Sequence, residues 1–472
     1  MNQAVPVSTP NRERRRLRLR GLVQGVGFRP HVYRCALQLG ITGFVGNDSE
    51  GVLIEAEGEH LDAFVQLLRD ELPPLARIDK LIQAPLALSG AEGPHDFYIA
   101  PTASGAANGA AIPADVAICE DCLQELFDPG NRRYLHPFIA CCNCGPRYTM
   151  TRQLPYDRVN TAMAGFALCS ACEREYTDPA DRRFHAEPVA CHDCGPRLSA
   201  DIRDTARALA AGDILAIKGV GGYHLACDAR NQGAVTRLRD CKRRDGKPFA
   251  VMVLNLASAA RHIDLQDEVA AQLYSRERPV VIAPSLAARD ALADYLSPGL
   301  GTLGLMLPYT PAHYLLFHAL LGAPGECDWL RESNDLALVM TSANISGEPL
   351  ITDTPEAERQ LADIVDSFLH HDRDIPARAD DSVLRVAPGV TATVRRARGY
   401  TPHAIKLTQA GPDVLALGPH LKSTITMTRD NRAYLSPHVG DLGTAATVRF
   451  HRETAVAMQA MLQTRPQLIA CD

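Results

Sequence analysis

The sequence contains no run of 18 or more apolar residues, the length at which a membrane-spanning helix is expected. The arginine-rich segment Arg12–Arg20 could begin a secretory signal, but no apolar region of the required length follows it. The chain also lacks the excess of lysine and arginine of a general nucleic-acid binder, because its formal net charge is −6. These absences predict a cytoplasmic protein without membrane or nucleic-acid partners.

No Walker A loop is present, which excludes a P-loop ATPase. The 472 residues are 46% hydrophobic and 22% charged, an ordinary globular composition with length for about three or four domains. Fourteen cysteines stand out against this background. In a reducing compartment, paired cysteines are more often metal ligands than disulfides.

Eight cysteines follow the spacing C-x2-C-x18-C-x2-C, which occurs twice with 24 residues between the copies. The residues around them also repeat, because segments 126–147 and 176–197 align at a constant offset of 50. Two Cys-x-x-Cys pairs complete a closed tetrahedral shell, so the sequence predicts two structural zinc ions. It leaves open which pairs share an ion. The predicted ligands are Cys119, Cys122, Cys141, Cys144, Cys169, Cys172, Cys191 and Cys194.

The N-terminal part alternates between strand-like and helix-like segments. RRLRLRGLV, TGFVGN, GVLIEAEG and DFYIAP read as strands, whereas HVYRCALQLG and HLDAFVQLLRDEL show the apolar period of helices. The order β-α-β-β-α-β predicts a ferredoxin-like sandwich over residues 1–100. An Ala-, Gly- and Pro-rich linker at 91–115 leads to the zinc domain, predicted at 101–200.

The remaining chain predicts two further parts and an α+β multidomain protein. Apolar strands such as ILAIKG, FAVMVL, PVVIAP and LALVMTS alternate with helical stretches, which indicates an α/β domain over 201–405. Segment 406–472 begins with the strand VLALG and contains a probable hairpin turning at Asp430-Asn431. It ends with an amphipathic helix around 445–463 and the strand QLIACD.

A glycine-rich turn joins the first strand to the first helix. Gly25 and Gly27 allow backbone N–H groups to converge on an anion before a helix N-terminus, where the helix dipole favours negative charge. Arg29 adds a forked cation suited to phosphate. A structural loop with an exposed arginine is the alternative.

The string VQGVGFR resembles the acylphosphatase signature, and GFVGND places Asn47 where that family keeps its water-orienting asparagine. The resemblance implies that Arg29 and the loop Gln24, Gly25, Val26, Gly27 and Phe28 bind the phosphate of an acyl phosphate. Asn47 would then position the attacking water.

Two polar motifs occur about a hundred residues apart in the α/β part. Lys242, Arg244 and Lys247 precede an apolar strand, and Ser342 and Asn344 end another. These residues resemble the K-x-R and S-x-N motifs of the YrdC family, which makes carbamoyl-type adenylates from ATP. The resemblance implies ATP with Mg²⁺ as a substrate, held by cations that stabilise charge on the phosphoryl oxygens. Strings around Lys218, Arg378, Arg395 and Arg398 extend the resemblance.

The order of these parts resembles the hydrogenase maturation carbamoyltransferases, the HypF family. The resemblance implies that carbamoyl phosphate is hydrolysed to carbamate, which ATP converts to carbamoyl adenylate before transfer to the C-terminal cysteine of HypE. Members of that family continue into a complete actin-like transferase domain, so 406–472 is expected to be its truncated start. We expect this chain to hydrolyse carbamoyl phosphate and form the adenylate, but not to carbamoylate HypE.

Two alternatives remain. A threonylcarbamoyl-adenylate synthase of tRNA modification would share the YrdC-like motifs but leave the acylphosphatase-like and zinc segments unexplained. A zinc-organised binding scaffold without catalytic activity would account for the repeated cysteine pairs alone.

Overall fold

The structure is a computed structural model that describes residues 12–48, 51–89, 95–100, 112–154, 156–244, 246–286, 292–345 and 347–472. Most of the predicted linker at 91–115 lies outside these residues. The chain forms two compact units. The first contains residues 1–113 and 173–186, and the second contains residues 114–172 and 187–472.

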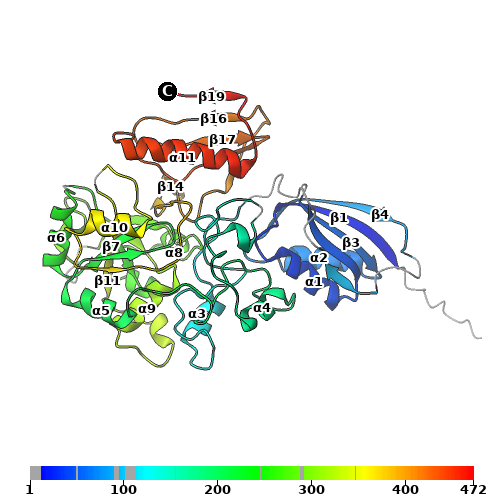
Figure 1. The fold of residues 1–472 in the computed structure, drawn as a ribbon, viewed down its shortest axis with the longest axis horizontal. Coiled ribbons are helices and arrows are strands. Elements are labelled where there is room, and N and C mark those ends of the chain that lie inside the picture. Colours follow the sequence, from blue (N-terminus) through cyan, green and yellow to red (C-terminus); the bar gives the residue numbers. More distant parts are fainter. Residues whose placement is uncertain are drawn as a thin grey trace, which may run out of the picture. The chain divides into compact units, whose positions relative to one another are not determined.

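The first unit contains a five-stranded sheet in the order β4-β1-β3-β2-β5, with helices α1 and α2 beside it (Figure 1). Alternate residues of the central strands, such as Leu17, Leu19 and Ile54, are fully buried, whereas their neighbours are more exposed. The elements are β1 (Glu13–Leu22), α1 (Phe28–Gln38), β2 (Thr42–Asp48), β3 (Gly51–Gly58), α2 (Leu61–Asp70), β4 (Arg77–Leu86) and β5 (Phe97–Ile99).

The β-α-β-β-α-β order is confirmed and DFYIAP contains a strand as predicted, but that strand is not the last one of this order. The last strand of the order is β4, which pairs antiparallel with β1. The segment DFYIAP instead supplies the fifth strand β5, which lies parallel to β2 at the other edge. Because most β4 side chains are exposed, the strand lacks the alternation of apolar and polar residues that the prediction relied on.

The cysteine repeat is mostly irregular chain with two short helices at equivalent positions. Cys119 directly precedes α3, and Cys169 directly precedes α4. The elements of this region are α3 (Glu120–Phe127), the 3₁₀ helix η1 (Arg158–Asn160) and α4 (Ser170–Thr177).

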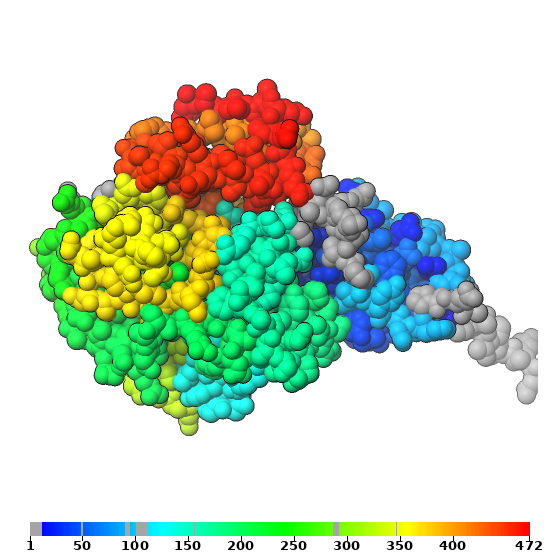
Figure 2. All heavy atoms as spheres, in the orientation of Figure 1, coloured from blue at the N-terminus to red at the C-terminus, as the bar shows by residue number. Residues whose placement is uncertain are grey.

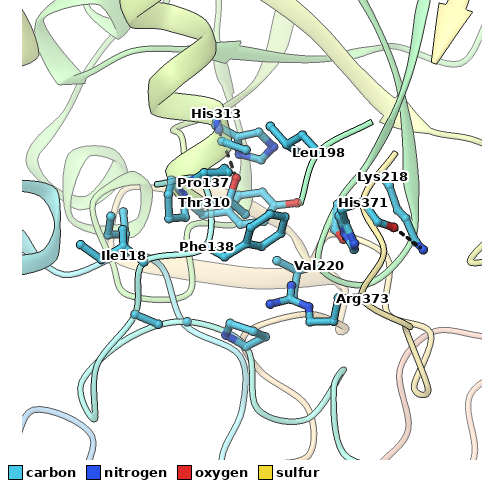
Figure 3. A pocket seen from close by; sticks show the side chains of 18 of the residues that line it. Ile118, Pro137, Phe138, Leu198, Lys218, Val220, Thr310, His313, His371 and Arg373 are labelled. Atoms are coloured by element: carbon cyan, nitrogen blue, oxygen red, sulfur yellow. Dashed lines mark hydrogen bonds between the residues drawn. The ribbon is translucent and has the colours of Figure 1, made fainter. Parts of the chain in front are cut away.

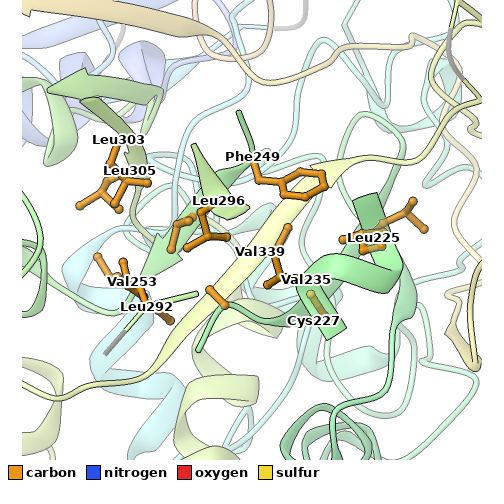
Figure 4. Close-up of a cluster of buried hydrophobic side chains, with 14 of the residues drawn as sticks. Leu225, Cys227, Val235, Phe249, Val253, Leu292, Leu296, Leu303, Leu305 and Val339 are labelled. Atoms are coloured by element: carbon orange, nitrogen blue, oxygen red, sulfur yellow. The ribbon is translucent and has the colours of Figure 1, made fainter. Parts of the chain in front are cut away.

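A nine-stranded mixed sheet forms the body of the second unit, in the order β12-β6-β7-β11-β8-β10-β9-β13-β14. One buried apolar cluster, drawn in Figure 4, packs residues such as Leu225, Phe249 and Val339 from three of these strands or their ends. The elements are α5 (Ile202–Ala211), β6 (Leu215–Lys218), β7 (Tyr223–Asp228), α6 (Gln232–Cys241), β8 (Ala250–Val253), α7 (Leu256–Ala259), α8 (Asp267–Leu273), β9 (Val280–Pro284), η2 (Asp294–Leu296), β10 (Thr302–Met306), α9 (Pro311–Leu320), η3 (Asp328–Leu330), β11 (Ala337–Ser342), α10 (Thr354–Leu361), β12 (Ser367–Leu369), β13 (Val383–Ala387) and β14 (Val390–Arg395).

The C-terminal segment forms a third sheet, in the order β15-β18-β17-β16-β19, with α11 packed against it. The predicted hairpin at Asp430-Asn431 is confirmed, because Arg429 pairs with Arg432. In Figure 2 this segment (red) lies beside the yellow segment of the same unit, and Phe450 stacks under Arg378 with 4.5 Å from the guanidinium carbon to the ring centroid. The elements are β15 (Ala404–Lys406), β16 (Val414–Ala416), β17 (Thr426–Arg429), β18 (Arg432–Leu435), α11 (Ala445–Leu462) and β19 (Leu468–Ala470).

Among the described residues, no helix combines the length and the apolar character needed to cross a membrane.

Candidate functional sites

The first four cysteines of the repeat converge into one cluster. Cys119 Sγ lies 3.7 Å from Cys141 Sγ, and Cys144 Sγ lies 3.8 Å from Cys141 Sγ and 3.6 Å from Cys122 Sγ. Around a tetrahedral ion with metal–sulfur bonds of about 2.3 Å, neighbouring sulfurs stand about 3.8 Å apart. The cluster therefore fits a structural zinc ion with a closed shell.

The last four cysteines form a second cluster of the same kind. Cys191 Sγ lies 3.7 Å from Cys169 Sγ and 3.8 Å from Cys194 Sγ, and the four sulfurs lie within 4.8 Å of one another. The prediction of two four-cysteine zinc sites is confirmed. The structure also decides the open question of pairing, because each ion takes its ligands from within one copy of the repeat.

The two clusters differ in their surroundings. Cys122, Cys141 and Cys144 belong to the same buried apolar cluster as residues of the nine-stranded sheet, including Leu215 and Ile217. Two thiols of the second cluster, those of Cys169 and Cys194, are only partly buried.

Two arginines of the first zinc module, which is the copy of the repeat that contains Cys119 to Cys144, contact the second cluster. Arg132 and Arg133 direct Nη2 atoms at Cys172 Sγ, at 3.0 and 3.4 Å. Because a zinc ion with four thiolates carries net negative charge, these guanidinium groups stabilise the ligand set.

The glycine loop of the first unit has the geometry of an anion-binding turn. Gly25 and Gly27 have positive φ angles of 66° and 72°, which favour glycine, and Gly27 is the N-cap of α1. Val26 and Phe28 are buried, so they offer a ligand only backbone groups. Arg29 is partly exposed in the first turn of α1.

Asn47 lies on the hairpin next to this loop. Gln24 Nε2 donates to the carbonyl oxygen of Gly51 at 3.3 Å, which connects the loop to the β2–β3 hairpin. Asn47 pairs with Val52 in that hairpin and is only 8% exposed. Its Oδ1 is buried without a hydrogen-bond donor among the described residues. The predicted acylphosphatase-like residues therefore lie in one unit, and one of them has an unused acceptor.

The K-x-R and S-x-N motifs meet in the second unit. Lys242, which follows α6, donates through Nζ to the carbonyl oxygens of Ser342 at 2.7 Å and Asn344 at 3.1 Å, and to Asn344 Oδ1 at 3.3 Å. Ser342 Oγ donates to the same Oδ1 at 3.1 Å. Two motifs separated by about a hundred residues thus form one polar cluster.

Cations surround this cluster. Burial, together with the charges of Arg244 and Lys247, lowers the pKa of Lys242 to about 7. Burial and neighbouring arginines, including Arg395, lower the pKa of Arg244 to about 10. Asp380 forms an ion pair with Arg395 and is the carboxylate that acts on all of these groups. An excess of positive charge around the buried Lys242 favours an anionic ligand.

Sequence reasoning missed two groups at this cluster, Asp380 and His438. Burial and the charge of Arg395 lower the pKa of His438 to about 4, so its imidazole is neutral at pH 7. His438 belongs to the C-terminal segment, and no spacing along the chain connects it with Lys242. The available signal for Asp380 was its position two residues after Arg378, within the segment that extends the YrdC resemblance.

The other predicted nucleotide residues have contacts of their own. Lys218 Nζ donates to the carbonyl oxygen of His371 at 3.0 Å and to Thr354 Oγ1 at 3.3 Å. Arg378 stacks on Phe450. Arg398 is buried and donates through Nε to Asp381 Oδ1 at 2.8 Å, which makes it a structural ion pair.

Family models match four consecutive parts of the chain. An acylphosphatase model matches residues 15–99, and a HypF finger model matches 118–151 and 168–200. A model described as telomere recombination, which covers the Sua5, YciO and YrdC proteins, matches 207–397. A HypF Kae1-like domain model matches 409–472.

Curated relatives match along almost the whole chain. "Carbamoyltransferase HypF2" of Cupriavidus necator is 52% identical over 98% of this chain and 59% of its own length. "Carbamoyltransferase HypF" of Rhizobium leguminosarum bv. viciae is 49% identical over 97% of this chain and 59% of its own length. The chain thus spans about three fifths of these relatives.

Solved structures agree with these matches. Full-length HypF in its phosphate- and nucleotide-bound form has a TM-score of 0.90 and 39% identity, covering 99% of this chain and 61% of that one. HypF of T. kodakarensis has a TM-score of 0.86 and 38% identity, covering 98% of this chain and 59% of that one. With its domain order, zinc clusters and fold in common with these proteins over about three fifths of their length, the chain belongs to the HypF family.

Proposed function

We propose that this chain hydrolyses carbamoyl phosphate and converts the released carbamate, with ATP, to carbamoyl adenylate. The observation that carries the proposal is the meeting of Lys242 with Ser342 and Asn344 inside a cluster of cations. The matches to an acylphosphatase model and to two solved HypF structures support it.

In the first step, Arg29 and the N–H groups of the glycine loop bind the phosphate of carbamoyl phosphate. Asn47 accepts a hydrogen bond from water through the Oδ1 that has no other donor among the described residues. The water attacks phosphorus, and the bond between phosphorus and the carbamoyl oxygen breaks. The products are phosphate and carbamate.

In the second step, a carbamate oxygen attacks the α-phosphorus of ATP and pyrophosphate leaves. Lys242, Arg244, Lys247 and Arg395 stabilise the negative charge that develops on the phosphoryl oxygens, as fixed cations in a water-poor site do. Mg²⁺ accompanies ATP as part of the substrate. The predicted roles of Ser342, Asn344, Lys218 and Arg378 as nucleotide contacts belong to this proposal.

For the whole protein, we propose the C-terminal cysteine of HypE as the carbamoyl acceptor and the cytoplasm as its compartment. The relatives' name, carbamoyltransferase, supports a transfer step. The domain limits 1–100, 101–200, 201–405 and 406–472 are proposed with it. The limit between the last two falls inside β15, which pairs with β18 of the C-terminal sheet.

The first step is tested by phosphate release from carbamoyl phosphate. Arg29→Ala should abolish release, and Asn47→Ala should lower kcat by about 10²-fold or more, as expected for loss of a group that orients the nucleophile. Arg34→Ala is the matched control, because Arg34 is an exposed arginine on the same helix. Phosphate release by Arg29→Ala at the wild-type rate would remove this site.

The second step is tested by formation of AMP from ATP in the presence of carbamoyl phosphate. Lys242→Ala should abolish it, whereas Arg243→Ala, at an exposed neighbour, should not. AMP formation that instead requires threonine and bicarbonate would favour the threonylcarbamoyl-adenylate synthase. No ATP turnover with either substrate set would favour the binding scaffold.

A further inference from the structure

A small cavity lies within the second unit, between the first zinc module and the nine-stranded sheet (Figure 3). Its walls come from the loop around Phe138, from Lys218 at the end of β6 and Val220 just after it, and from the start of α9 at Thr310 and His313. Its internal volume is about 50 Å³.

Two buried cations border this cavity, and they differ in their partners. Lys218 Nζ donates to the carbonyl oxygen of His371 and to Thr354 Oγ1, whereas Arg373 has no such acceptor among the described residues. Arg373 is 6% exposed, and its guanidinium carbon lies 5.4 Å from the ring centroid of Phe138. Among the residues that the structure describes, none forms a hydrogen bond or ion pair with this guanidinium group. Burial lowers the pKa of Arg373 to about 10, so the group remains charged at neutral pH. The carboxylates of Asp115 and Asp372 favour its charged form but do not hydrogen-bond to it, so its N–H groups remain available to a ligand.

Uncharged polar groups also line the cavity, and two of them lie close together. Tyr309 Oη and His313 Nδ1 are buried, and neither has a hydrogen-bond partner among the described residues. The two rings pack edge to face with centroids 4.6 Å apart, and the guanidinium carbon of Arg398 lies 3.5 Å from the ring centroid of Tyr309. Burial lowers the pKa of His313 to about 3, so its imidazole is neutral at pH 7.

The size of the cavity limits its occupant. One water molecule requires roughly 10–15 Å³ of such volume, so about 50 Å³ holds three to five non-hydrogen atoms. Carbamate and bicarbonate each have four. Carbamoyl phosphate and a nucleotide are too large.

We propose that this cavity binds one small planar carboxylate-type anion, with Arg373 as its cationic partner and Tyr309 and His313 as its polar neighbours. The choice of carbamate as the natural occupant rests on the proposed function, because carbamate is released by one half-reaction and consumed by the other. Bicarbonate has the same shape and charge, and it serves as the stable probe. The cavity is then a holding site that keeps carbamate out of bulk water before adenylation.

The experiment measures thermal stabilisation of the chain by sodium bicarbonate at constant ionic strength, with sodium chloride as the balancing salt. A saturable rise of the melting temperature is expected for the wild type. Arg373→Met should weaken the apparent affinity by about 10-fold or more, as for loss of a charge-assisted hydrogen bond. Arg385→Met, at an exposed arginine of β13, should respond like the wild type.

Two outcomes would overturn the proposal. One is a wild-type response no different from that to chloride, which would mean that the cavity holds water only. The other is an equal response in Arg373→Met and wild type. If Arg373→Met does not fold, Tyr309→Phe serves instead, because it removes only the hydroxyl and should weaken bicarbonate binding by about 3-fold or more. Freshly dissolved ammonium carbamate, compared with ammonium bicarbonate, distinguishes the two anions, and tighter binding of carbamate is expected.

A second readout separates this proposal from the proposed function. Arg373→Met should release phosphate from carbamoyl phosphate at the wild-type rate, while the AMP formed per phosphate released should fall by about 10-fold or more. If the wild type forms no AMP, the adenylation step fails, yet bicarbonate binding still decides the cavity. If the wild type forms AMP and Arg373→Met forms as much per phosphate, the cavity does not hold carbamate.

Discussion

The two zinc sites should differ in what they stabilise, and a matched pair of substitutions can show this. Cys144→Ser and Cys194→Ser change equivalent positions of the repeat, 50 residues apart. Cys144 is fully buried and packs in the apolar cluster that also contains Phe127 and Trp329. Cys194 is only partly buried. Each variant removes one thiolate from one closed shell.

The expected magnitude follows from the helix that the first zinc holds. Leu126 and Phe127 of α3 are buried, and burial of each side chain contributes about 1.5–3 kcal/mol. Unfolding α3 alone therefore costs about 3–6 kcal/mol, out of domain stabilities of about 5–15 kcal/mol. For a domain of this size, 1 kcal/mol corresponds to about 2–4 °C in Tm, so Cys144→Ser should lower Tm by at least about 6 °C.

Trp329 provides the assay, because it is the single tryptophan of the chain. Its ring lies edge to face with Phe127 at 5.0 Å, so its fluorescence reports on the packing of α3. Thermal unfolding followed by this fluorescence should show the shift for Cys144→Ser and less than about 2 °C for Cys194→Ser. Mass spectrometry of the metal should find one zinc lost in each. An equal shift in both variants would refute the reasoning.

Three further predictions concern the second unit. Burial by itself would raise the pKa of Asp381, but the charges of Arg398 and His224 hold this pKa far below its ordinary range. The ion pair therefore stabilises the fold above about pH 4, and its contribution is lost as the pH falls further. Asp381→Asn should therefore lose about 3–5 kcal/mol at pH 7 in urea unfolding, and this difference should shrink below about pH 4; a constant difference would contradict it. Because the pKa of Lys242 is about 7, its amine is mostly neutral at pH 8, and binding of the ATP anion should make it take up as much as about 0.9 proton. In calorimetry this uptake makes the heat of binding depend on the buffer, and the dependence should be absent in Lys242→Met. Gly221→Ala would place a Cβ 2.1 Å from the carbonyl oxygen of Ala379 and should destabilise the domain by about 1–3 kcal/mol, whereas Gly325→Ala, in open space, should not; equal melting temperatures would show that the loop can move.

Local signals in the sequence predicted several elements correctly. The hairpin at Asp430-Asn431 and the helix α11 follow from turn residues and apolar periodicity, which act over a few residues. Strand β4 escaped prediction because an exposed edge strand shows no such period. Its place in the sheet depends on pairing with β1, which is distant in the sequence.

By itself, the sequence determined the eight zinc ligands, because each Cys-x-x-Cys pair is a local turn and the duplication repeats it at a fixed offset. It also identified the residues of the two polar motifs. Only the tertiary structure decided that Lys242 lies against Ser342 and Asn344. Strand β11 is inserted between β7 and β8, and this non-consecutive order carries the end of β11 to the loop after α6.

The structure alone also decided the surroundings of Arg373, Tyr309 and His313. Tyr309 and His313 lie around the start of α9, Arg373 comes from a distant segment, and both segments meet the loop of Phe138 where the first zinc module packs on the sheet. Spacing along a chain predicts sites built from neighbouring residues. Burial and unused hydrogen-bonding groups arise from contacts between distant segments, and they exist only in the folded protein.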